Sequence, residues 1–132
     1  MGDGLLAIFP VADPNEAASA AAEALAAATE TLGDLETRNA GEGAASLRMV
    51  IALHYGTVTY GNIGSADRLD FTVIGPAVNL VSRAEAVAKS LSLPLVITDD
   101  FATVYGRELS SIGQHRFRGL DKEHELFVPA SP

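Results

Sequence analysis

The stretch from Leu53 to Arg83 reads LHYGTVTYGNIGSADRLDFTVIGPAVNLVSR, and its pattern predicts a strand, a loop, a second strand and then a helix. Gly75-Pro76 is typical of the point where a strand stops and a helix begins, because proline fits the first helical position. Asn79 and Arg83 are four residues apart, so they share one face of this helix close to its start. A helix start presents free backbone N–H groups, which favour an anionic ligand. The stretch therefore predicts a phosphate-binding site.

Two strands are expected around the loop in this stretch. Residues 47–60 are rich in β-branched and aromatic side chains and predict a long strand that is bent or broken at Gly56. Residues 68–74 predict a second strand that pairs antiparallel with the first, and the glycines within residues 61–65 predict the loop between them. The helix that follows is expected to bury Val78, Val81, Ala84 and Ala88.

An alanine-rich helix is predicted nearer the N-terminus. Asp13 reads as its cap, with Pro14 at the first helical position and Glu16 three residues after the cap. Residues 16–35 are dominated by alanine, the strongest helix former. The composition of residues 39–46 predicts a loop after the helix. The expected buried stripe consists of Ala18, Ala21, Ala22, Leu25, Ala28, Leu32 and Leu35.

The remaining elements complete a single α+β fold. In chain order they are a buried strand at 94–98, a short helix at 101–105 capped by Asp99 or Asp100, and a final hairpin from residues 112–120 and 125–129. With 132 residues, the chain has the length of one domain, residues 1–132. We expect a sandwich of helices on a mostly antiparallel sheet.

The composition excludes several classes of function. The net charge is −8, with 17 acidic residues against 9 Lys and Arg, which argues against nucleic acid and anionic membranes as partners. The absence of cysteine excludes disulfides, thiolate catalysis and cysteine-based zinc sites. The apolar run at residues 4–11 is too short to span a bilayer and follows no basic segment. We therefore expect a cytoplasmic location.

The first residues have two interpretations. Gly2-Asp3-Gly4 followed by LLAIF is typical of a hairpin turn that leads into a strand, yet only Met1 precedes it. Either the chain starts partway through a fold, or a frayed terminus precedes an ordinary first strand. The spacing alone does not decide between them.

The sequence resembles the class III nucleotidyl cyclases, the adenylyl and guanylyl cyclase catalytic domain. The resemblance covers nearly the whole chain, and the most specific part is the helix entry T-V-I-G-x-x-V-N-x-x-x-R at residues 72–83. Three further segments carry it: GDGLLAIF at 2–9, LHYGTVTYGNIGS at 53–65 and FRGL at 117–120. The resemblance implies a ferredoxin-like nucleotide cyclase fold, which is an α+β sandwich.

The resemblance also implies roles for five residues. Asp3 matches the second of two aspartates that hold a pair of Mg²⁺ or Mn²⁺ ions in the family. Asn79 matches the asparagine that orients the ribose, and Arg83 matches the arginine that stabilises the α-phosphate in the transition state. Thr72 lies where family members contact the purine, which favours ATP over GTP. Arg118 lies near a basic residue that meets the terminal phosphates.

The departures from the family concern the start of the chain. The strand that carries the first metal-binding aspartate, and the strand with the adenine-binding lysine, would lie upstream of Met1. The resemblance thus favours a domain truncated at its N-terminus, and a single aspartate is a poor cage for a divalent ion. Because the family builds each site across a dimer, we expect a homodimer that places Asp3 opposite Asn79 and Arg83. We expect little or no cyclase activity from these 132 residues alone.

The site residues also have plain structural interpretations. Asparagine is common near helix starts, arginine on solvated helix faces, aspartate in turns and threonine in strands, which covers Asn79, Arg83, Asp3 and Thr72. His54 is expected to be a packed or interface histidine rather than a general base. Three further predictions concern surface or capping roles: His115 and His124 at the surface, and Asp99-Asp100 as a cap rather than a metal pair.

The sequence thus predicts an adenylate cyclase-type domain that converts ATP to 3′,5′-cyclic AMP and pyrophosphate in intracellular signalling. Three alternatives stay open. One is a catalytically degenerate nucleotide-binding or dimerisation module, another is an interaction fragment, and the third is a guanylate cyclase. Asn79 and Arg83 favour the enzyme, whereas the missing first aspartate favours the degenerate module or the fragment.

Overall fold

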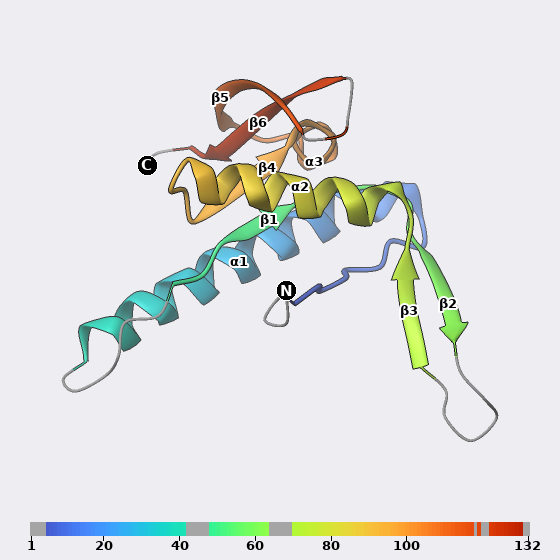
Figure 1. Cartoon of the computed structure of the whole chain (residues 1–132), viewed down its shortest axis with the longest axis horizontal. Helices are drawn as coiled ribbons and strands as arrows, with labels where there is room; N and C mark the ends of the chain where they lie inside the picture. The colour runs from blue at the N-terminus through green and yellow to red at the C-terminus, as the bar shows by residue number, and fades with distance from the viewer. Residues whose placement is uncertain (1–4, 42–47, 64–69, 118, 120–121, 131–132) are drawn as a thin grey trace.

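The computed structural model describes residues 5–41, 48–63, 70–117, 119 and 122–130, which form an α+β fold (Figure 1). A short 3-10 helix precedes the first α-helix. In chain order the elements are the 3-10 helix Pro14–Glu16, α1 Ala17–Ala40, β1 Ile51–Leu53, β2 Thr59–Ile63, β3 Asp70–Ile74, α2 Pro76–Ser90, β4 Leu95–Thr98, α3 Asp99–Tyr105, β5 Leu109–Arg116 and β6 Glu123–Pro129.

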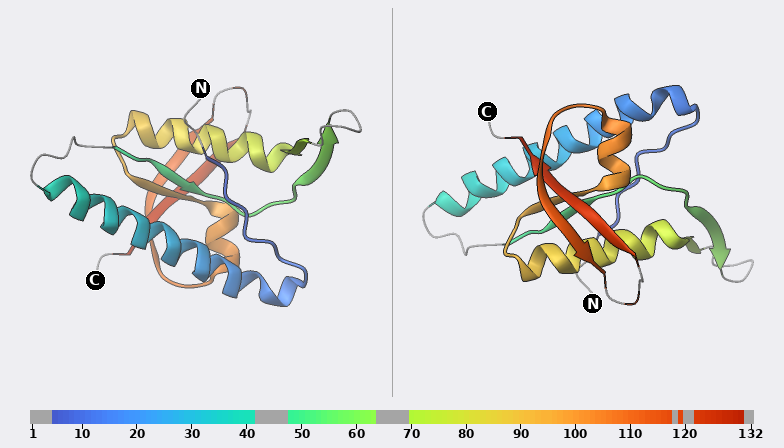
Figure 2. Two further views of the ribbon diagram at one scale, coloured as in Figure 1. Left: turned by 90° about the horizontal axis from the view of Figure 1, so that it is seen from below. Right: turned by 90° about the horizontal axis from the view of Figure 1, so that it is seen from above.

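The main sheet has four strands in the order β1-β4-β6-β5. β1 and β4 are parallel, whereas β6 pairs antiparallel with both β4 and β5. α1 and α2 lie on opposite sides of this sheet (Figure 2). All four residues of β4 are buried, as expected for a strand with both faces covered. The predicted α+β class with a mostly antiparallel sheet is confirmed.

Alternation along β4 divides the core in two. Leu95 and Ile97 pack with Phe101 of α3 and with Leu25 of α1 on one side. Val96 points to the other side, where it packs with Ala84 and Ala88 of α2, with Phe117 after β5 and with Leu126 of β6. Small alanines on both helices let their backbones approach the sheet closely. The second of these two clusters fixes the position of α2, which carries the predicted site.

The long strand predicted over residues 47–60 is broken near Gly56, as the sequence indicated. β1 belongs to the main sheet, whereas β2 pairs with β3 in a separate two-stranded sheet that projects away from it (Figure 1). A Cβ added at Gly56 would stand only 2.8 Å from the Cβ of Ala77, so the chain passes directly against the start of α2. The loop predicted at 61–65 begins later than expected, because residues up to Ile63 pair with β3. Residues 64–69 lie outside the described part.

Of the predictions about the N-terminal third, the strand is wrong and the buried stripe is right only in part. Residues 5–11 form no strand, and Leu5 is 95% exposed. None of the described strands pairs with them, and a strand exists only through hydrogen bonds to a neighbour. The stripe of α1 is confirmed at Ala21, Leu25 and Ala28, and Leu32 packs against the same cluster. Ala18 is exposed instead of buried, and the stripe also includes Ala17 and Ala24. Alanine occurs on most sides of this helix, so the pattern could not fix which side faces the sheet.

The boundaries of the later elements differ modestly from the expected ones. Thr98, rather than Asp99 or Asp100, caps α3, because its side-chain oxygen accepts a hydrogen bond from the Phe101 N–H at 3.3 Å. β5 runs over Leu109–Arg116 instead of 112–120, since Phe117 leaves the strand to pack beneath α2. Within the described residues, no helix is long and apolar enough to cross a membrane.

Candidate functional site

The start of α2 has the backbone that the Gly75-Pro76 motif predicts. Gly75 has φ 137°, a conformation that other residues rarely adopt, and a Cβ there would stand 3.3 Å from the carbonyl oxygen of Thr57. The Gly75 carbonyl accepts hydrogen bonds from the N–H groups of Val78 and Asn79, at 3.1 and 3.3 Å. Gly75, the N-cap residue, has no side chain with which to cap this helix. The Gly75 carbonyl therefore begins the helix one turn before Asn79.

Asn79 and Arg83 line a single open hollow of about 520 Å³ beside α2. Its other α2 residues are Ser82, Ala86 and Val87. Asn79 is exposed and Arg83 is half-buried, so both side chains are available to a ligand from solvent. The spacing of four residues thus brings the two predicted side chains to one surface, as expected. Their chemical roles stay predictions.

The hollow also contains a residue that the sequence reasoning missed. Arg116, the last residue of β5, lines it from the sheet side. The signal was available, because the next residue, Phe117, is an apolar core residue and neighbouring residues of an extended chain point in opposite directions. Arg116 therefore turns outward where Phe117 turns inward. The sequence pointed to Arg118 as the basic residue of this segment, and Arg118 lies outside the described residues.

The guanidinium of Arg83 rests against the chain just after β5. A Cβ built on Gly119 would stand 3.5 Å from Nη2 and 3.6 Å from Cζ of Arg83. This contact connects α2 with the FRGL segment, which is distant in sequence. Gly119 has φ 81°, so the turn at this point favours glycine.

The hollow is locally positive although the whole chain is acidic. Among the described residues, Lys89 forms an ion pair with Glu85, and the rings of His54 and His124 lie within 4.0 Å of Asp100 and Asp99. None of these contacts involves Arg83 or Arg116. Two guanidinium groups that lack a carboxylate partner in the described part of the chain favour an anion. Arginine matches phosphoryl oxygens with a planar fork of donors.

Of the other predicted site residues, the described part of the chain includes only the backbone of Thr72. Thr72 lies in β3, where its backbone position pairs with that of Gly61 in β2. β3 ends at Ile74 and α2 begins at Pro76, so Thr72 and Asn79 lie on consecutive elements of the chain. Asp3 and Arg118 lie outside the described residues.

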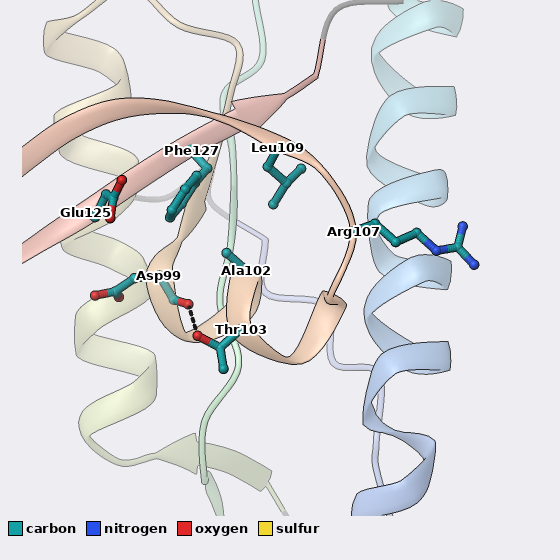
Figure 3. A pocket seen from close by; sticks show the side chains of 7 residues that line it. All are labelled: Asp99, Ala102, Thr103, Arg107, Leu109, Glu125 and Phe127. Carbon is teal, nitrogen blue, oxygen red and sulfur yellow. Dashed lines mark hydrogen bonds between the residues drawn. The ribbon is translucent and has the colours of Figure 1, made fainter.

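A second hollow, of about 370 Å³, lies between α3, the start of β5 and the middle of β6 (Figure 3). Its polar groups are already engaged: Asp99 contacts His124, and Glu125 accepts a hydrogen bond from the Ser111 hydroxyl. Arg107 points away from both carboxylates in Figure 3. Because its charged groups do not converge on one point, this hollow is the weaker candidate.

His54 is packed inside the fold and does not line either hollow among the described residues. His54 is packed as predicted, with Nδ1 2.8 Å from the Thr98 hydroxyl oxygen and a side chain that is 6% exposed. Burial lowers the pKa of His54, and the carboxylates of Asp100 and Asp99 oppose this only in part. The pairing of Nδ1 with the Thr98 hydroxyl therefore suits a neutral imidazole.

The surface prediction for His124 is wrong. Its ring stacks on Phe117 with centroids 5.0 Å apart, and its Nδ1 lies 3.3 Å from Asp99 Oδ1. It shares the inward face of β6 with Leu126, which the alternation of the strand requires. His115 is half-buried, and its Nε2 lies 3.1 Å from the Ile112 carbonyl oxygen. In the part of the chain that is described, no three His, Asp or Glu residues are grouped so that they could hold a metal ion.

Residues 1–127 match the family model for the adenylate and guanylate cyclase catalytic domain. The chain is 33% identical to an adenylate cyclase of Anabaena cylindrica over 124 residues, which is 92% of this chain and 24% of that protein. It is 31% identical to photoactivated adenylate cyclase subunit beta of Euglena gracilis over 122 residues, 89% of this chain and 14% of that one. The chain therefore spans a quarter or less of these relatives.

Two solved structures share the fold. The guanylyl cyclase Cya2 superposes with a TM-score of 0.69 at 24% identity, covering 93% of this chain and 64% of that one. The adenylyl cyclase CyaB from P. aeruginosa superposes with a TM-score of 0.63 at 24% identity, covering 90% of this chain and 61% of that one.

Proposed function

The chain belongs to the adenylate and guanylate cyclase catalytic domain family, and on that premise we propose that it supplies one side of an adenylate cyclase site. The reaction is the conversion of ATP to 3′,5′-cyclic AMP and pyrophosphate, as part of intracellular signalling. The observation that carries the proposal is the placement of Asn79 and Arg83 on one open hollow at the start of α2.

The two side chains suit different parts of the nucleotide. Arg83 presents a permanently charged fork to the α-phosphate, where negative charge develops as the ribose 3′-oxygen attacks. Asn79 has both a donor and an acceptor, so it can orient the ribose ring through hydrogen bonds. Positioning of the attacking oxygen and stabilisation of the phosphate are the two requirements of such a transfer.

Metal binding requires more than the described residues provide. The family reaction uses two Mg²⁺ or Mn²⁺ ions, and we propose Asp3 as a ligand of this pair. Divalent ions of this kind need several oxygen ligands around one point. The described ranges contain no cluster of three carboxylate or imidazole groups, so they do not fit a two-ion site by themselves. The steps derived for this chain are therefore limited to Asn79 and Arg83.

The active unit that we propose is a homodimer with a shared site. Asn79 and Arg83 of one subunit would face the nucleotide and metal ions held by the other. Even as a homodimer, these 132 residues are expected to have little activity, because Asp3 is the match to only one of the family's two metal-binding aspartates. Thr72 is proposed to contact the purine through its hydroxyl, which favours ATP over GTP.

The proposal is tested by mixing the chain with a related cyclase catalytic domain. That second domain keeps its metal-binding aspartates but carries alanine at the positions equivalent to Asn79 and Arg83, so it is inactive alone. With Mn-ATP, we expect cyclic AMP only from the mixture; with Mn-GTP, we expect much less cyclic GMP. Association of the two chains without any product would favour the degenerate dimerisation module. A mixture that prefers GTP would favour the guanylate cyclase.

A further inference from the structure

His54 lies between the main sheet and the strand break at Gly56. It follows β1 directly, and β1 pairs in parallel with β4, so His54 comes level with Thr98 at the end of β4. Its Nδ1 lies 2.8 Å from the Thr98 hydroxyl oxygen, and its side chain is only 6% exposed. The steps proposed for Asn79 and Arg83 give this packed titratable group no role.

The other nitrogen of the His54 ring lies close to the start of α2. A Cβ at Gly56 would stand 3.2 Å from Nε2 of His54 and 2.8 Å from the Cβ of Ala77, so the ring edge and the first turn of α2 share the space above Gly56. A second contact follows one residue later, because a Cβ at Gly75 would stand 3.3 Å from the carbonyl oxygen of Thr57. The first turn of α2 therefore rests on residues 56–57 and on the neighbouring imidazole.

Ala77 links this contact to the proposed site. It lies in the first turn of α2, two residues before Asn79. Because the hydrogen bonds of a helix fix the residues of one turn relative to each other, a displacement of Ala77 moves Asn79 with it. The far end of α2 is held separately, since Ala88 is buried in the core. A movement of the His54 ring would therefore be felt at Asn79 more than at Ala88.

The charge of His54 decides which hydrogen bond its Nδ1 can make. In a neutral ring, Nδ1 can accept the Thr98 hydroxyl hydrogen, while the Thr98 oxygen accepts from the Phe101 N–H at 3.3 Å. A protonated ring donates from both nitrogens, so the Thr98 hydroxyl hydrogen would lose the acceptor that it has in the neutral form. The carboxylate of Asp100, 4.0 Å from Nδ1 and more than half exposed, would instead attract the ring. Protonation therefore favours a ring that turns away from Thr98 toward Asp100.

The groups around His54 set the pH at which this change occurs. Burial has the largest influence and lowers the pKa of His54 below its ordinary value of 6.5. Asp100 and Asp99 of α3 raise this pKa in part, and His124 of β6 lowers it further. The neighbouring side chains from β4 and α2 carry no charge. The ring is therefore neutral at neutral pH and gains its proton on acidification.

We propose that His54 is a positioning residue of the cyclase site: its neutral ring, held by Thr98, fixes the start of α2 and with it Asn79, and protonation of the ring releases both. The inference rests on the proposed function, which it deepens by making the site depend on pH. Arg83 lies one turn further along α2 and also rests against Gly119, so it should be less affected. Acidification should therefore disturb the orientation of the ribose, which lowers kcat more than it raises KM.

NMR of the isotope-labelled full chain between about pH 8 and pH 5 tests the inference without a substrate. The ring C–H signals of His54 report its protonation, and the backbone and side-chain N–H signals of Asn79 report the start of α2. We expect both sets to change with one midpoint below pH 6.5, while the N–H of Ala88 stays unchanged. Three results would overturn the inference: different midpoints for His54 and Asn79, no change at Asn79, or an equal change at Ala88, which would indicate unfolding or movement of the whole helix.

Two histidine variants identify the group that is responsible. His54→Asn can still reach the Thr98 hydroxyl but does not titrate, so it should abolish the change at Asn79. His124→Asn is the matched control, because the His124 ring stacks on Phe117 at the other side of the cluster. It should leave the change at Asn79 in place, with a slightly higher midpoint, because His124 lowers the pKa of His54. A change that persists in His54→Asn and disappears in His124→Asn would refute the inference.

The mixed-domain assay distinguishes this inference from the proposed function. Where cyclic AMP forms, acidification should lower kcat about tenfold more in the parent chain than in His54→Asn, because misplacement of a positioning group by about 1 Å can cost roughly a hundredfold. A decline that both proteins share comes from ATP or from the second domain. Coinciding pH profiles of kcat would refute the inference alone. No cyclic AMP, although His54 and Asn79 titrate together, would refute the proposed function and leave the coupling intact.

Discussion

The guanidinium of Arg83 lies against the backbone of Gly119, where a Cβ would stand 3.5 Å from Nη2. This contact joins α2 to the turn after β5. In the sequence, β4, α3 and β5 lie between these two parts of the chain. Arg83 also lines the hollow, together with Asn79 and Arg116. The contact therefore offers a way to disturb the site without altering any charged residue.

Gly119→Ala tests this relationship. The left-handed backbone at φ 81° should make the substitution cost about 1–2 kcal/mol of unfolding free energy. The new methyl itself would only touch the Arg83 guanidinium, at 3.5 Å, so any effect on the site would come from a shift of the strained turn. We expect a lower yield of cyclic AMP in the mixed-domain assay as well as a lower urea midpoint. Gly113→Ala is the matched control, since Gly113 has φ 92° and open space around it. It should lose stability without losing yield. Equal losses of yield in the two variants would contradict the role of the contact.

Gly56→Ala tests the break between β1 and β2. The added Cβ would stand 2.8 Å from Ala77 Cβ and 3.2 Å from His54 Nε2, so the start of α2 must shift. Overpacking of this kind costs about 1–3 kcal/mol, which denaturant unfolding would detect. Gly33→Ala provides the opposite case, because nothing lies within 4 Å of its position in α1. It should raise stability by up to about 1 kcal/mol. A Gly56→Ala variant as stable as the parent chain would refute the close approach.

His54 makes the stability of the fold depend on pH. Burial lowers its pKa in the folded state, while Asp100 and Asp99 raise it in part and His124 lowers it further. The unfolded chain, with a histidine pKa of about 6.5, therefore binds the proton more readily than the folded chain does. The contribution of His54 is complete above that pH and is lost as the pH falls toward the lower folded value. Melting temperatures measured between about pH 8 and pH 5 should therefore decline on acidification.

His54→Asn provides the comparison for this pH dependence. Its side-chain amide can still reach the Thr98 hydroxyl, which lies 2.8 Å from Nδ1 of the histidine, but it does not titrate. We expect a shallower decline of melting temperature on acidification than in the parent chain. Parallel declines in the two proteins would show that other groups cause the pH dependence.

The elements around the site were the most predictable from sequence. Gly75-Pro76 marks the start of α2 for two reasons. Glycine tolerates the backbone conformation of the cap, and the N–H that proline lacks has no partner within the helix at its first position. Gly56 marks the break in the strand because the chain passes close to Ala77 there. A glycine inside a run of β-forming residues already indicates such a close approach. The four-residue spacing placed Asn79 and Arg83 on one surface, since helix geometry is the same in every protein.

What could not be predicted depends on contacts between distant segments. The alanines of α1 give no strong periodicity, so only packing against Leu95 and Ile97 decides which of them are buried. His124 looked like a surface residue because its burial depends on stacking against Phe117. Arg116 was overlooked because its relation to Arg83 arises from the fold and has no local signal beyond the neighbouring Phe117.

The most direct test of the central claim is Arg83→Ala in the mixed-domain assay. The claim is that this chain supplies Asn79 and Arg83 to a site completed by the metal-binding aspartates of a second domain. Cyclic AMP formed by the mixture should fall by about a hundredfold or more with Arg83→Ala, as for other groups that stabilise transition-state charge. Arg107→Ala, the exposed control, should leave the yield unchanged. A mixture that makes cyclic AMP equally well with Arg83→Ala would contradict the account.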